Sequence, residues 1–378
     1  MFDERDRKYM ERALSLASAA VGLASPNPTV GCVVVRDNEI VGEGWHEYAR
    51  VEHAETAALR AAGFRAAGAT VYLTLEPCSH HGRTPPCAEA LIAGRVRRVV
   101  VPLIDPNPKV AGLGIEKLRA AGIQVDVGLG TEPAMELLES FACQVTTGRP
   151  LVVAKVGMSL DGRIAAPRDD DSWISSAEAR DFGQSLRQKL DAILVGVGTV
   201  VADDPELTYR GGSRKSPALA RVILDRHLRM PRGARVFTCS KAPILIFCAP
   251  DAPSERRSEL ENAGAEVVSL PAGDSGIDLP RVLDELSRRG MPGLLVEGGS
   301  SVHWSFLAAG LVDKFYFIAA PMVLGGAAVP AVGGAGYATV GEAPRFKIRR
   351  TFFVGPDVAL EAYPSFSRSI LSPWKSKG

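Results

Sequence analysis

The spacing of apolar side chains predicts alternating helices and strands over residues 1–127. Apolar positions recur at helical spacing over residues 9–23, and Ser25-Pro26-Asn27-Pro28 ends that segment. Two short β-branched runs, 30–35 and 40–45, flank a turn at Asn38 and predict a hairpin. Beyond it, the pattern predicts helices near 54–64, 88–92 and 114–121, and strands at 69–75, 98–103 and 123–127.

The pattern fades over residues 128–150, which predicts a short helix and a linker, and a second series then begins. It predicts strands at 151–158, 192–197, 221–224 and 244–248, with helices near 177–189 and 254–263. A further strand at 293–297 runs through Gly298-Gly299-Ser300-Ser301 into a helix at 302–309. The last part, 314–324 and 348–362, is rich in strand-forming residues.

Strands that alternate with helices indicate an α/β layer fold with a partly parallel sheet. A chain of 378 residues is too long for one ordinary core, because most domains hold roughly 100–200 residues. Thr147-Gly148-Arg149-Pro150 separates the two series with polar, glycine and proline residues. We therefore expect two domains, residues 1–147 and 148–378.

Composition narrows the class of partner and the compartment. The 44 Lys+Arg against 43 Asp+Glu leave a net charge of +1 without a dense basic block, so nucleic acid is not the expected partner, whereas a small phosphorylated substrate is compatible. No apolar run reaches the roughly 20 residues of a membrane span, and the charged N-terminus does not resemble a secretory signal. Six cysteines are expected to be thiols or metal ligands in a reducing cytoplasm. The sequence does not decide whether the protein forms a homo-oligomer.

The strongest chemical signal is His53-Ala54-Glu55 followed by Cys78 and Cys87. One imidazole and two thiolates suit a catalytic Zn²⁺, which keeps three protein ligands and leaves the fourth position for water. The metal lowers the pKa of that water, and hydrolytic deamination also needs a proton carrier. Glu55, two positions after a ligand, is the expected carrier. Cys87 follows Pro85-Pro86 and is expected to begin a helix, whose N-terminus favours the thiolate.

A structural zinc site, or three unrelated core residues, would also explain one histidine and two cysteines. A structural site normally closes with a fourth protein ligand, and His80 or His81 could supply one. Glu55 favours the catalytic interpretation, because a structural site does not need a carboxylate beside an open coordination position.

Eight residues separate Cys78 from Cys87, and the whole string reads PCSHHGRTPPC. With Pro26-Asn27-Pro28-Thr29-Val30-Gly31 and Asp105-Pro106-Asn107-Pro108-Lys109, it resembles the deaminase half of the bifunctional deaminase–reductases of riboflavin biosynthesis. The resemblance implies a cytidine-deaminase-like three-layer α/β/α domain. It also implies that a bound pyrimidine or its ribose phosphate lies near Asn27, His46, His80, Asp105, Asn107 and Lys109. Arg50-Val51-Glu52 departs from the family's glycine-rich approach to His53, and this departure affects the conformation expected of the loop.

The second half lacks GxGxxG after a strand, so a two-glycine-motif Rossmann domain is not favoured. It carries KVGMSLDGR from Lys155, SWIS from Ser172, GTV from Gly198, ADDP from Ala202, LTYR from Leu207 and VEGG from Val296. In that order these strings resemble the reductase half of the same family, which implies a dihydrofolate-reductase-like α/β domain. Glu297 to Ser301 predicts a strand end, a turn and a helix start, where backbone N–H groups can hold the phosphates of a dinucleotide.

The resemblance also implies the residues of the reductase site. An NADPH site would be lined by Met158, Trp173, Thr199, Asp203, Gly299, Ser300, Ser301, Val302, His303, Trp304 and Ser305. The ribosylamino substrate would face Lys155, Asp171, Arg187, Leu207, Arg210 and Glu297. Arg187 and Arg210 suit phosphate clamps because a guanidinium forms paired hydrogen bonds. Lys155 is the candidate catalytic residue, expected to favour the open-chain form of the sugar.

Two functions from different classes follow. The first is a two-step enzyme: zinc-dependent deamination of 2,5-diamino-6-ribosylamino-4(3H)-pyrimidinone 5′-phosphate, then NADPH-dependent reduction of its ribosyl chain to give 5-amino-6-ribitylamino-uracil 5′-phosphate. The alternative is a nucleic-acid or nucleoside deaminase with a C-terminal binding module, against which the near-neutral charge and the lack of a basic stripe argue. A non-catalytic zinc module with a regulatory nucleotide-binding domain is a third hypothesis, which Glu55 disfavours.

Overall fold

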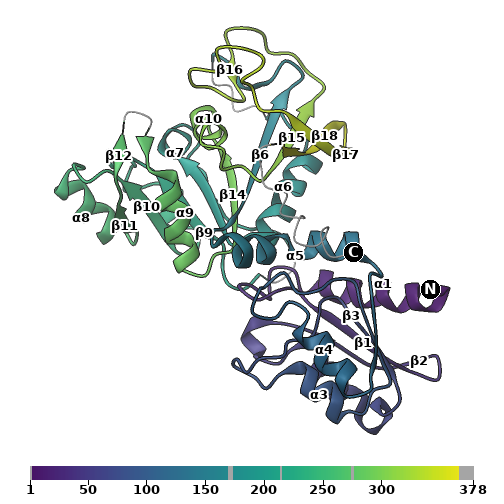
Figure 1. Ribbon diagram of the computed structural model, residues 1–378. Coiled ribbons are helices and arrows are strands. Elements are labelled where there is room, and N and C mark those ends of the chain that lie inside the picture. Colours follow the sequence, from purple (N-terminus) through teal and green to yellow (C-terminus); the bar gives the residue numbers. More distant parts are fainter. Residues whose placement is uncertain (1, 169–172, 213–214, 274–275, 366–378) are drawn as a thin grey trace. The chain divides into compact units, whose positions relative to one another are not determined.

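The computed structural model describes residues 2–168, 173–212, 215–273 and 276–365 (Figure 1). Their contacts divide the chain into two compact units, the first up to Gly148 and the second from Arg149 onward. Asp171 lies outside the described residues. Among the described residues, no helix combines the length and the apolar character of a membrane span.

The first unit is built on a five-stranded sheet in the order β2-β1-β3-β4-β5. The strands are β1 (Gly31–Arg36), β2 (Glu39–Trp45), β3 (Thr70–Leu73), β4 (Arg98–Val101) and β5 (Gln124–Val127). β1 pairs antiparallel with β2 and β3, which confirms the predicted hairpin, while β3, β4 and β5 are parallel. All five strands were predicted, with ends displaced by a few residues.

Helices cover both faces of this sheet and produce three layers. They are α1 (Glu4–Ala19), α2 (Ala54–Ala62), α3 (Cys87–Ala93), α4 (Leu113–Ala120) and α5 (Thr131–Thr147). α1 packs with α5, whereas α2, α3 and α4 are successive neighbours. The short helix expected near 128–150 is in fact α5, of 17 residues, whose buried Ala134, Leu138 and Ala142 keep helical spacing.

Two glycines of β2 bring the metal-bearing helix α2 unusually close to the sheet. A Cβ at Gly42 would lie 2.2 Å from the Ala58 carbonyl oxygen, and one at Gly44 would lie 2.3 Å from that of Ala54. Only glycine fits at such a separation. The contact therefore places the beginning of α2 directly over one end of the sheet.

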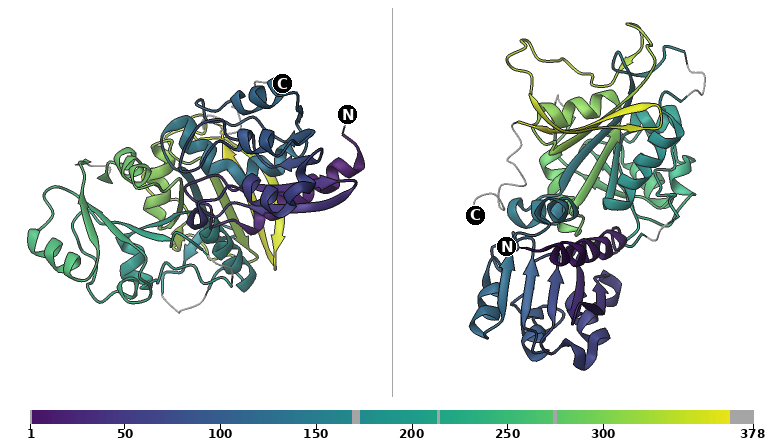
Figure 2. Two further views of the ribbon diagram at one scale, coloured as in Figure 1. Left: turned by 90° about the horizontal axis from the view of Figure 1, so that it is seen from below. Right: turned by 90° about the vertical axis from the view of Figure 1, so that its right-hand side faces the viewer.

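The second unit contains a nine-stranded sheet in the order β11-β10-β9-β8-β14-β6-β15-β18-β17. Its strands are β6 (Leu151–Ser159), β8 (Ala192–Gly196), β9 (Ala220–Leu224), β10 (Ile244–Cys248), β11 (Glu266–Ser269), β14 (Gly293–Gly298), β15 (Lys314–Ala320), β17 (Phe346–Val354) and β18 (Asp357–Pro364). The strands from β11 to β15 are parallel, and the β17–β18 hairpin adds an antiparallel edge (Figure 2). Two-stranded pairs join β7 (Arg163–Ala165) to β16 (Val329–Pro330) and β12 (Ala272–Gly273) to β13 (Gly276–Ile277).

Apolar clusters fill both faces of this sheet. One cluster joins the strands to α9 (Leu279–Arg288) and α10 (Ser300–Ala308). On the opposite face, one cluster includes residues of α7 (Val197–Asp203) and α8 (Ser254–Asn262), and another joins α6 (Ala177–Lys189) to β15 and β18. α7 and α9 were not predicted, although the Asp278 side chain caps α9 at its first turn by accepting from Arg281 N.

One predicted boundary in this unit needs correction. α10 begins at Ser300, because Gly299 serves as its N-cap, and not at residue 302. Within the strand-rich segment 314–324, β15 ends at Ala320, because the next residue, Pro321, cannot donate to the ladder.

Candidate active sites

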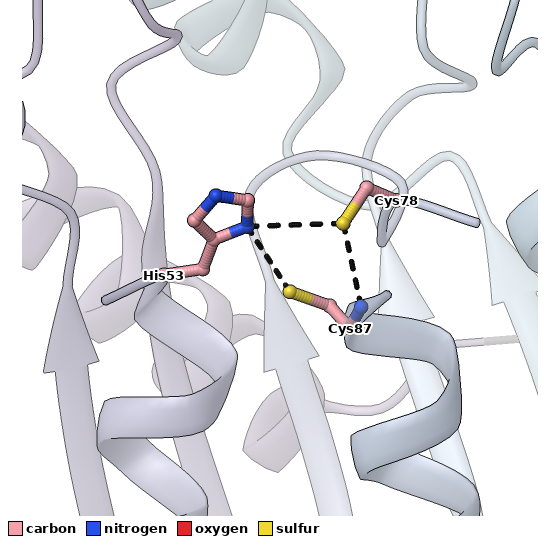
Figure 3. Close-up of side chains that lie close together, drawn as sticks. All are labelled: His53, Cys78 and Cys87. Atoms are coloured by element: carbon pink, nitrogen blue, oxygen red, sulfur yellow. Dashed lines mark hydrogen bonds between the residues drawn. The ribbon is translucent and has the colours of Figure 1, made fainter. Parts of the chain in front are cut away.

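The three predicted metal ligands lie together at the ends of three segments (Figure 3). His53 is the N-cap residue of α2, Cys87 is the first residue of α3, and Cys78 lies on the segment that follows β3. His53 Nδ1 lies 3.2 Å from Cys87 Sγ and 3.7 Å from Cys78 Sγ. Backbone N–H of Cys87 donates to Cys78 Sγ over 3.3 Å. Chain segments far apart in the sequence thus converge on one point.

This donor set fits zinc. Bonds of about 2.3 Å to sulfur and 2.0–2.1 Å to nitrogen at a tetrahedral ion place nitrogen and sulfur ligands roughly 3.6 Å apart. The two nitrogen–sulfur distances, 3.2 and 3.7 Å, lie near that value. No fourth histidine, cysteine or carboxylate joins the cluster among the described residues, and His80, which could have closed it, is exposed. Three protein ligands are the number that catalytic zinc sites keep.

Neighbouring groups favour the thiolate form of Cys78 and fix which ring nitrogen of His53 faces the sulfurs. The hydrogen bond with Cys87, reinforced by His53, lowers the pKa of Cys78 to about 4. Thr84 Oγ1 lies 3.4 Å from His53 Nε2, so Nδ1 is the ring nitrogen that faces the sulfurs. Sequence reasoning missed Thr84, whose only signal was its place inside the PCSHHGRTPPC insert.

Glu55 lies in the first turn of α2 with only 5% of its surface exposed. Interaction with the Cys87 thiol favours the charged form of its carboxyl group. Burial, with the negative charge of Cys78, raises the pKa of Glu55 to about 7. This carboxyl group lies beside the three ligand atoms. Because its pKa is near neutral, it is suited to acid–base catalysis.

Asn27 and His46 form a pair next to this cluster. Asn27 Nδ2 lies 3.0 Å from His46 Nε2, and His46 Nδ1 lies 2.9 Å from the Glu52 carbonyl oxygen. The His46 ring meets the His53 ring edge-on at 5.3 Å. Burial lowers the pKa of His46, so the neutral ring accepts from Asn27 and donates to Glu52. Asn27 thereby keeps its carbonyl oxygen for another partner.

The segment Arg50-Val51-Glu52, which lacks the glycines expected of the family, adopts a backbone conformation that normally favours glycine. Val51 has φ 64°, in the region that β-branched residues avoid. The turn places the Glu52 carbonyl oxygen on His46. Val51 therefore carries local backbone strain at the turn that positions Glu52.

The other expected substrate residues lie on one loop and on the insert. Asp105 is buried, and burial raises its pKa to about 7. Its side chain accepts from Asn107 N over 2.8 Å, and the Asn107 side chain accepts from Lys109 N over 3.1 Å. Lys109 is exposed. Glu76, which the sequence analysis did not select, anchors this loop by accepting from Asp105 N.

In the second unit, Lys155, Arg187 and Glu297 come together at the switch point of the sheet. β6 and β14 are parallel neighbours, and ligands bind open α/β sheets where strand order reverses. Arg187 Nε and Nη2 donate to the two Glu297 oxygens over 2.9 and 2.8 Å, and Nη1 donates to the Thr208 carbonyl oxygen. The Arg187 guanidinium, which the resemblance places at the substrate, thus forms a two-pronged ion pair with Glu297. Lys155 and Arg187 together lower the pKa of Glu297 against its burial.

The glycine-rich turn adopts the predicted strand–turn–helix form. Gly299 has φ 85°, a conformation suited to glycine, and a Cβ there would lie 3.2 Å from Thr199 Oγ1. The first turn of α7 and the turn after β14 therefore lie side by side. Ser301 is exposed beside them and Ser305 bonds the Ser301 carbonyl.

The side chains of several expected cofactor residues pack against other parts of the protein. Val302 and His303 have buried side chains, and the His303 ring packs on Phe315 at 5.5 Å. Ser300 is covered by Gly333, and Trp304 packs on Tyr337 at 5.1 Å. The first turn of α10 thus offers a ligand mainly its backbone, because its buried side chains point into the core.

The remaining expected residues are divided between core and surface. Leu207 is buried in an apolar cluster, and Met158 is half-buried. Asp203 is exposed at the end of α7. Trp173 is 72% exposed, with the Arg180 guanidinium 5.0 Å from its ring centre. The side chain of Arg210 is 60% exposed and donates to Glu206 over 3.1 Å.

Comparison with known families agrees with the two sites. Residues 3–103 match the model of the cytidine and deoxycytidylate deaminase zinc-binding region, and residues 150–360 match the RibD C-terminal domain. The riboflavin biosynthesis protein RibD of Aquifex aeolicus is 41% identical over 95% of this chain and 99% of its own. That of Escherichia coli is 41% identical over 94% and 98%. The RibD structure of Acinetobacter baumannii superposes with a TM-score of 0.85 at 36% identity, over 96% of this chain and 99% of that one.

Fold and sites thus define a zinc-dependent deaminase joined to a reductase in one polypeptide, with zinc and NADPH as the two cofactors. The chain belongs to the RibD family of bifunctional deaminase–reductases of riboflavin biosynthesis. This membership favours the two-step enzyme over the nucleic-acid deaminase and over the non-catalytic module. It also agrees with the expected cytidine-deaminase-like and reductase folds.

The ligand cluster predicts about one Zn²⁺ per chain, as expected for a site with three protein ligands. Cys78→Ser should lose most of the metal, because a hydroxyl is a far poorer zinc ligand than a thiolate. Elemental analysis of protein purified without chelator measures both. Cys143→Ser, at another buried cysteine of the same unit, is the control and should keep its zinc. A zinc-free wild-type protein would contradict the assignment.

Proposed function

We propose that residues 1–147 deaminate 2,5-diamino-6-ribosylamino-4(3H)-pyrimidinone 5′-phosphate. The observation that carries this proposal is the cluster of three ligand atoms beside the buried Glu55. Zinc supplies a Lewis acid that activates water at neutral pH when it is bound. Glu55 takes a proton from water at its carboxylate and delivers it to the departing 2-amino group. Asn27, held by His46, reads the pyrimidine edge, and the 105–109 loop contacts the ribose phosphate.

We propose that residues 148–378 reduce the ribosyl chain to give 5-amino-6-ribitylamino-uracil 5′-phosphate. NADPH supplies the hydride when it is bound. The backbone N–H groups at the start of α10, beside Thr199, hold its phosphates. Lys155, whose positive charge helps to lower the pKa of Glu297, stabilises the open-chain form of the sugar. Arg187 orients Glu297, which leaves the exposed Arg210 as the phosphate clamp.

We place both activities in the cytoplasm, because Cys78 and Cys87 must stay reduced to serve as ligands. The ligand of each half is a small molecule. Neither half needs a nucleic-acid partner for this chemistry.

The first test concerns Glu55. Glu55→Gln keeps the shape of the side chain but cannot carry a proton, so the deamination rate should fall by roughly 10²–10⁴-fold. Steady-state deamination, zinc content and reductase activity are measured on the same preparation, and the last two should not change. Deamination within about tenfold of wild type would count against Glu55 as proton carrier.

The second test concerns the division of the chain. A fragment beginning at Arg149 should bind NADPH with zinc absent, because it retains the buried Asp313 together with Arg149, which donates to it over 2.6 and 2.7 Å. A fragment beginning at Leu151 leaves Asp313, 1% exposed, without this partner, and should be less stable by about 3 kcal/mol. Calorimetric titration of NADPH and denaturant unfolding measure the two quantities. If neither fragment binds NADPH, the proposed boundary is wrong.

The third test concerns Arg210. Arg210→Lys keeps the positive charge but loses the planar fork, so substrate affinity of the reductase half should fall about tenfold while NADPH affinity barely changes. Both ligands are titrated into the variant. Arg288→Lys, at an exposed arginine of α9, is the control and should change neither. A loss of NADPH affinity alone would place Arg210 on the cofactor side.

A further inference from the structure

Glu76 is a buried carboxylate whose two oxygens are both occupied by backbone N–H groups. It is 3% exposed. Oε2 accepts from Asp105 N and Gly112 N, each over 2.9 Å. Oε1 accepts from Gly114 N over 2.9 Å and from Ile115 N over 3.1 Å. All four donors belong to the segment that carries Asp105, Asn107 and Lys109 or to the helix start that follows it.

These bonds hold both ends of one loop. Asp105 N lies at its beginning, and Gly112 N lies where the loop meets α4. α4 has no side-chain cap of its own, because its N-cap residue is Gly112. Glu76, remote in the sequence, binds the free N–H groups of the first turn in place of a cap. Between these ends, the side chains of Asp105 and Asn107 bind the backbone two residues further on.

The same contacts tie the loop to the metal-ligand segment. Glu76 is followed by Pro77 and the ligand Cys78. A Cβ on Gly114 would lie 2.0 Å from the Pro77 carbonyl oxygen, so the first turn of α4 packs directly on the residue before Cys78. One short segment therefore carries a zinc ligand and also anchors the expected substrate loop.

Only a side chain with two acceptor oxygens satisfies this arrangement. A glutamine would direct its NH₂ group at two backbone N–H donors, whichever way the amide is turned. Two buried donors would lose their partner and face another donor, which is costly in a dry environment.

We infer that Glu76 is a positioning residue of the deaminase, which holds the Asp105–Lys109 loop at a set distance from the zinc ligand Cys78 so that the loop can bind substrate. The inference rests on the proposed role of that loop in contacting the ribose phosphate. Glu76 itself touches neither the ligand atoms nor substrate, and its influence passes through the backbone.

The test compares Glu76→Gln with wild type in the full-length, zinc-loaded protein. KM for the diaminopyrimidine substrate should rise about tenfold, the size of one or two lost buried hydrogen bonds. The kcat should stay within about threefold, and zinc content and reductase activity should not change. Hydrogen exchange should become faster in the peptide covering residues 104–116 but not in α2. Glu76→Asp, which keeps both acceptors on a shorter stem, replaces Glu76→Gln if the latter does not fold and should raise KM in the same direction.

Two further variants separate the possible causes. Asp6→Asn removes another buried carboxylate of the same unit, which accepts from Tyr72 and Arg98. It should lower stability without raising KM, and an equal rise there would overturn the inference by showing a general effect of destabilisation. Loss of zinc from Glu76→Gln, or an unchanged KM in that variant, would also overturn it. Asn107→Ala tests the loop directly: an unchanged KM in Asn107→Ala would refute the proposed role of the loop, and with it this inference.

Discussion

The close packing of α2 against β2 is the constraint on which the deaminase site depends. Because Gly42 and Gly44 have no side chains, the backbone of α2 approaches the strand more closely than any other residue would permit. His53 at the helix N-cap and Glu55 in the first turn move with that helix. Displacement of α2 from β2 would move His53 Nδ1 away from the two sulfurs and Glu55 away from Cys87. The chemistry of the site therefore depends on two positions that bear no functional group.

The second unit places its site by another route. Parallel strands deliver their carboxyl ends to one edge of the sheet, where the order of strands reverses around β6 and β14. Lys155 lies on one of these strands and Glu297 on the other, and Arg187 reaches Glu297 from α6. The turn at Gly299 comes beside Thr199 because β8 and β14 are neighbours. The order of the strands thus brings Lys155 near Glu297 and Thr199 near Gly299, although the members of each pair are 100 or more positions apart in the chain.

Buried or bridging carboxylates organise the loops in both units. Glu76 anchors the loop after β4, and Asp161 accepts from Leu324 N and Gly325 N and so ties the turn after β6 to the chain after β15. These contacts lower the pKa of Asp161 to about 2, with Ser159 as the strongest contributor. Asp313 accepts from Val152 N and from Arg149 at the start of the second unit. In each case a carboxylate satisfies backbone N–H groups that no strand or helix pairs, and so gives irregular segments one conformation.

The sequence by itself determined the elements whose signals are local. The β1–β2 hairpin, the start of α3 at Cys87 and the strand–turn–helix at Gly299 follow from periodicity, proline and glycine, which act within a few residues. The ligand set of His53, Cys78 and Cys87, and Glu55 beside it, also followed from the sequence, because they combine side-chain types that few other sites require. Only the tertiary structure decided which groups the side chains contact. Glu76 could not be selected, because its partners lie about 30 to 40 positions away and are backbone groups that every residue carries. The ion pair between Arg187 and Glu297 could not be predicted, because a sequence shows a charge but not its partner. The burial of Val302 and His303 was also decided by the tertiary structure, since the rotation of a helix about its axis is set by packing against the sheet.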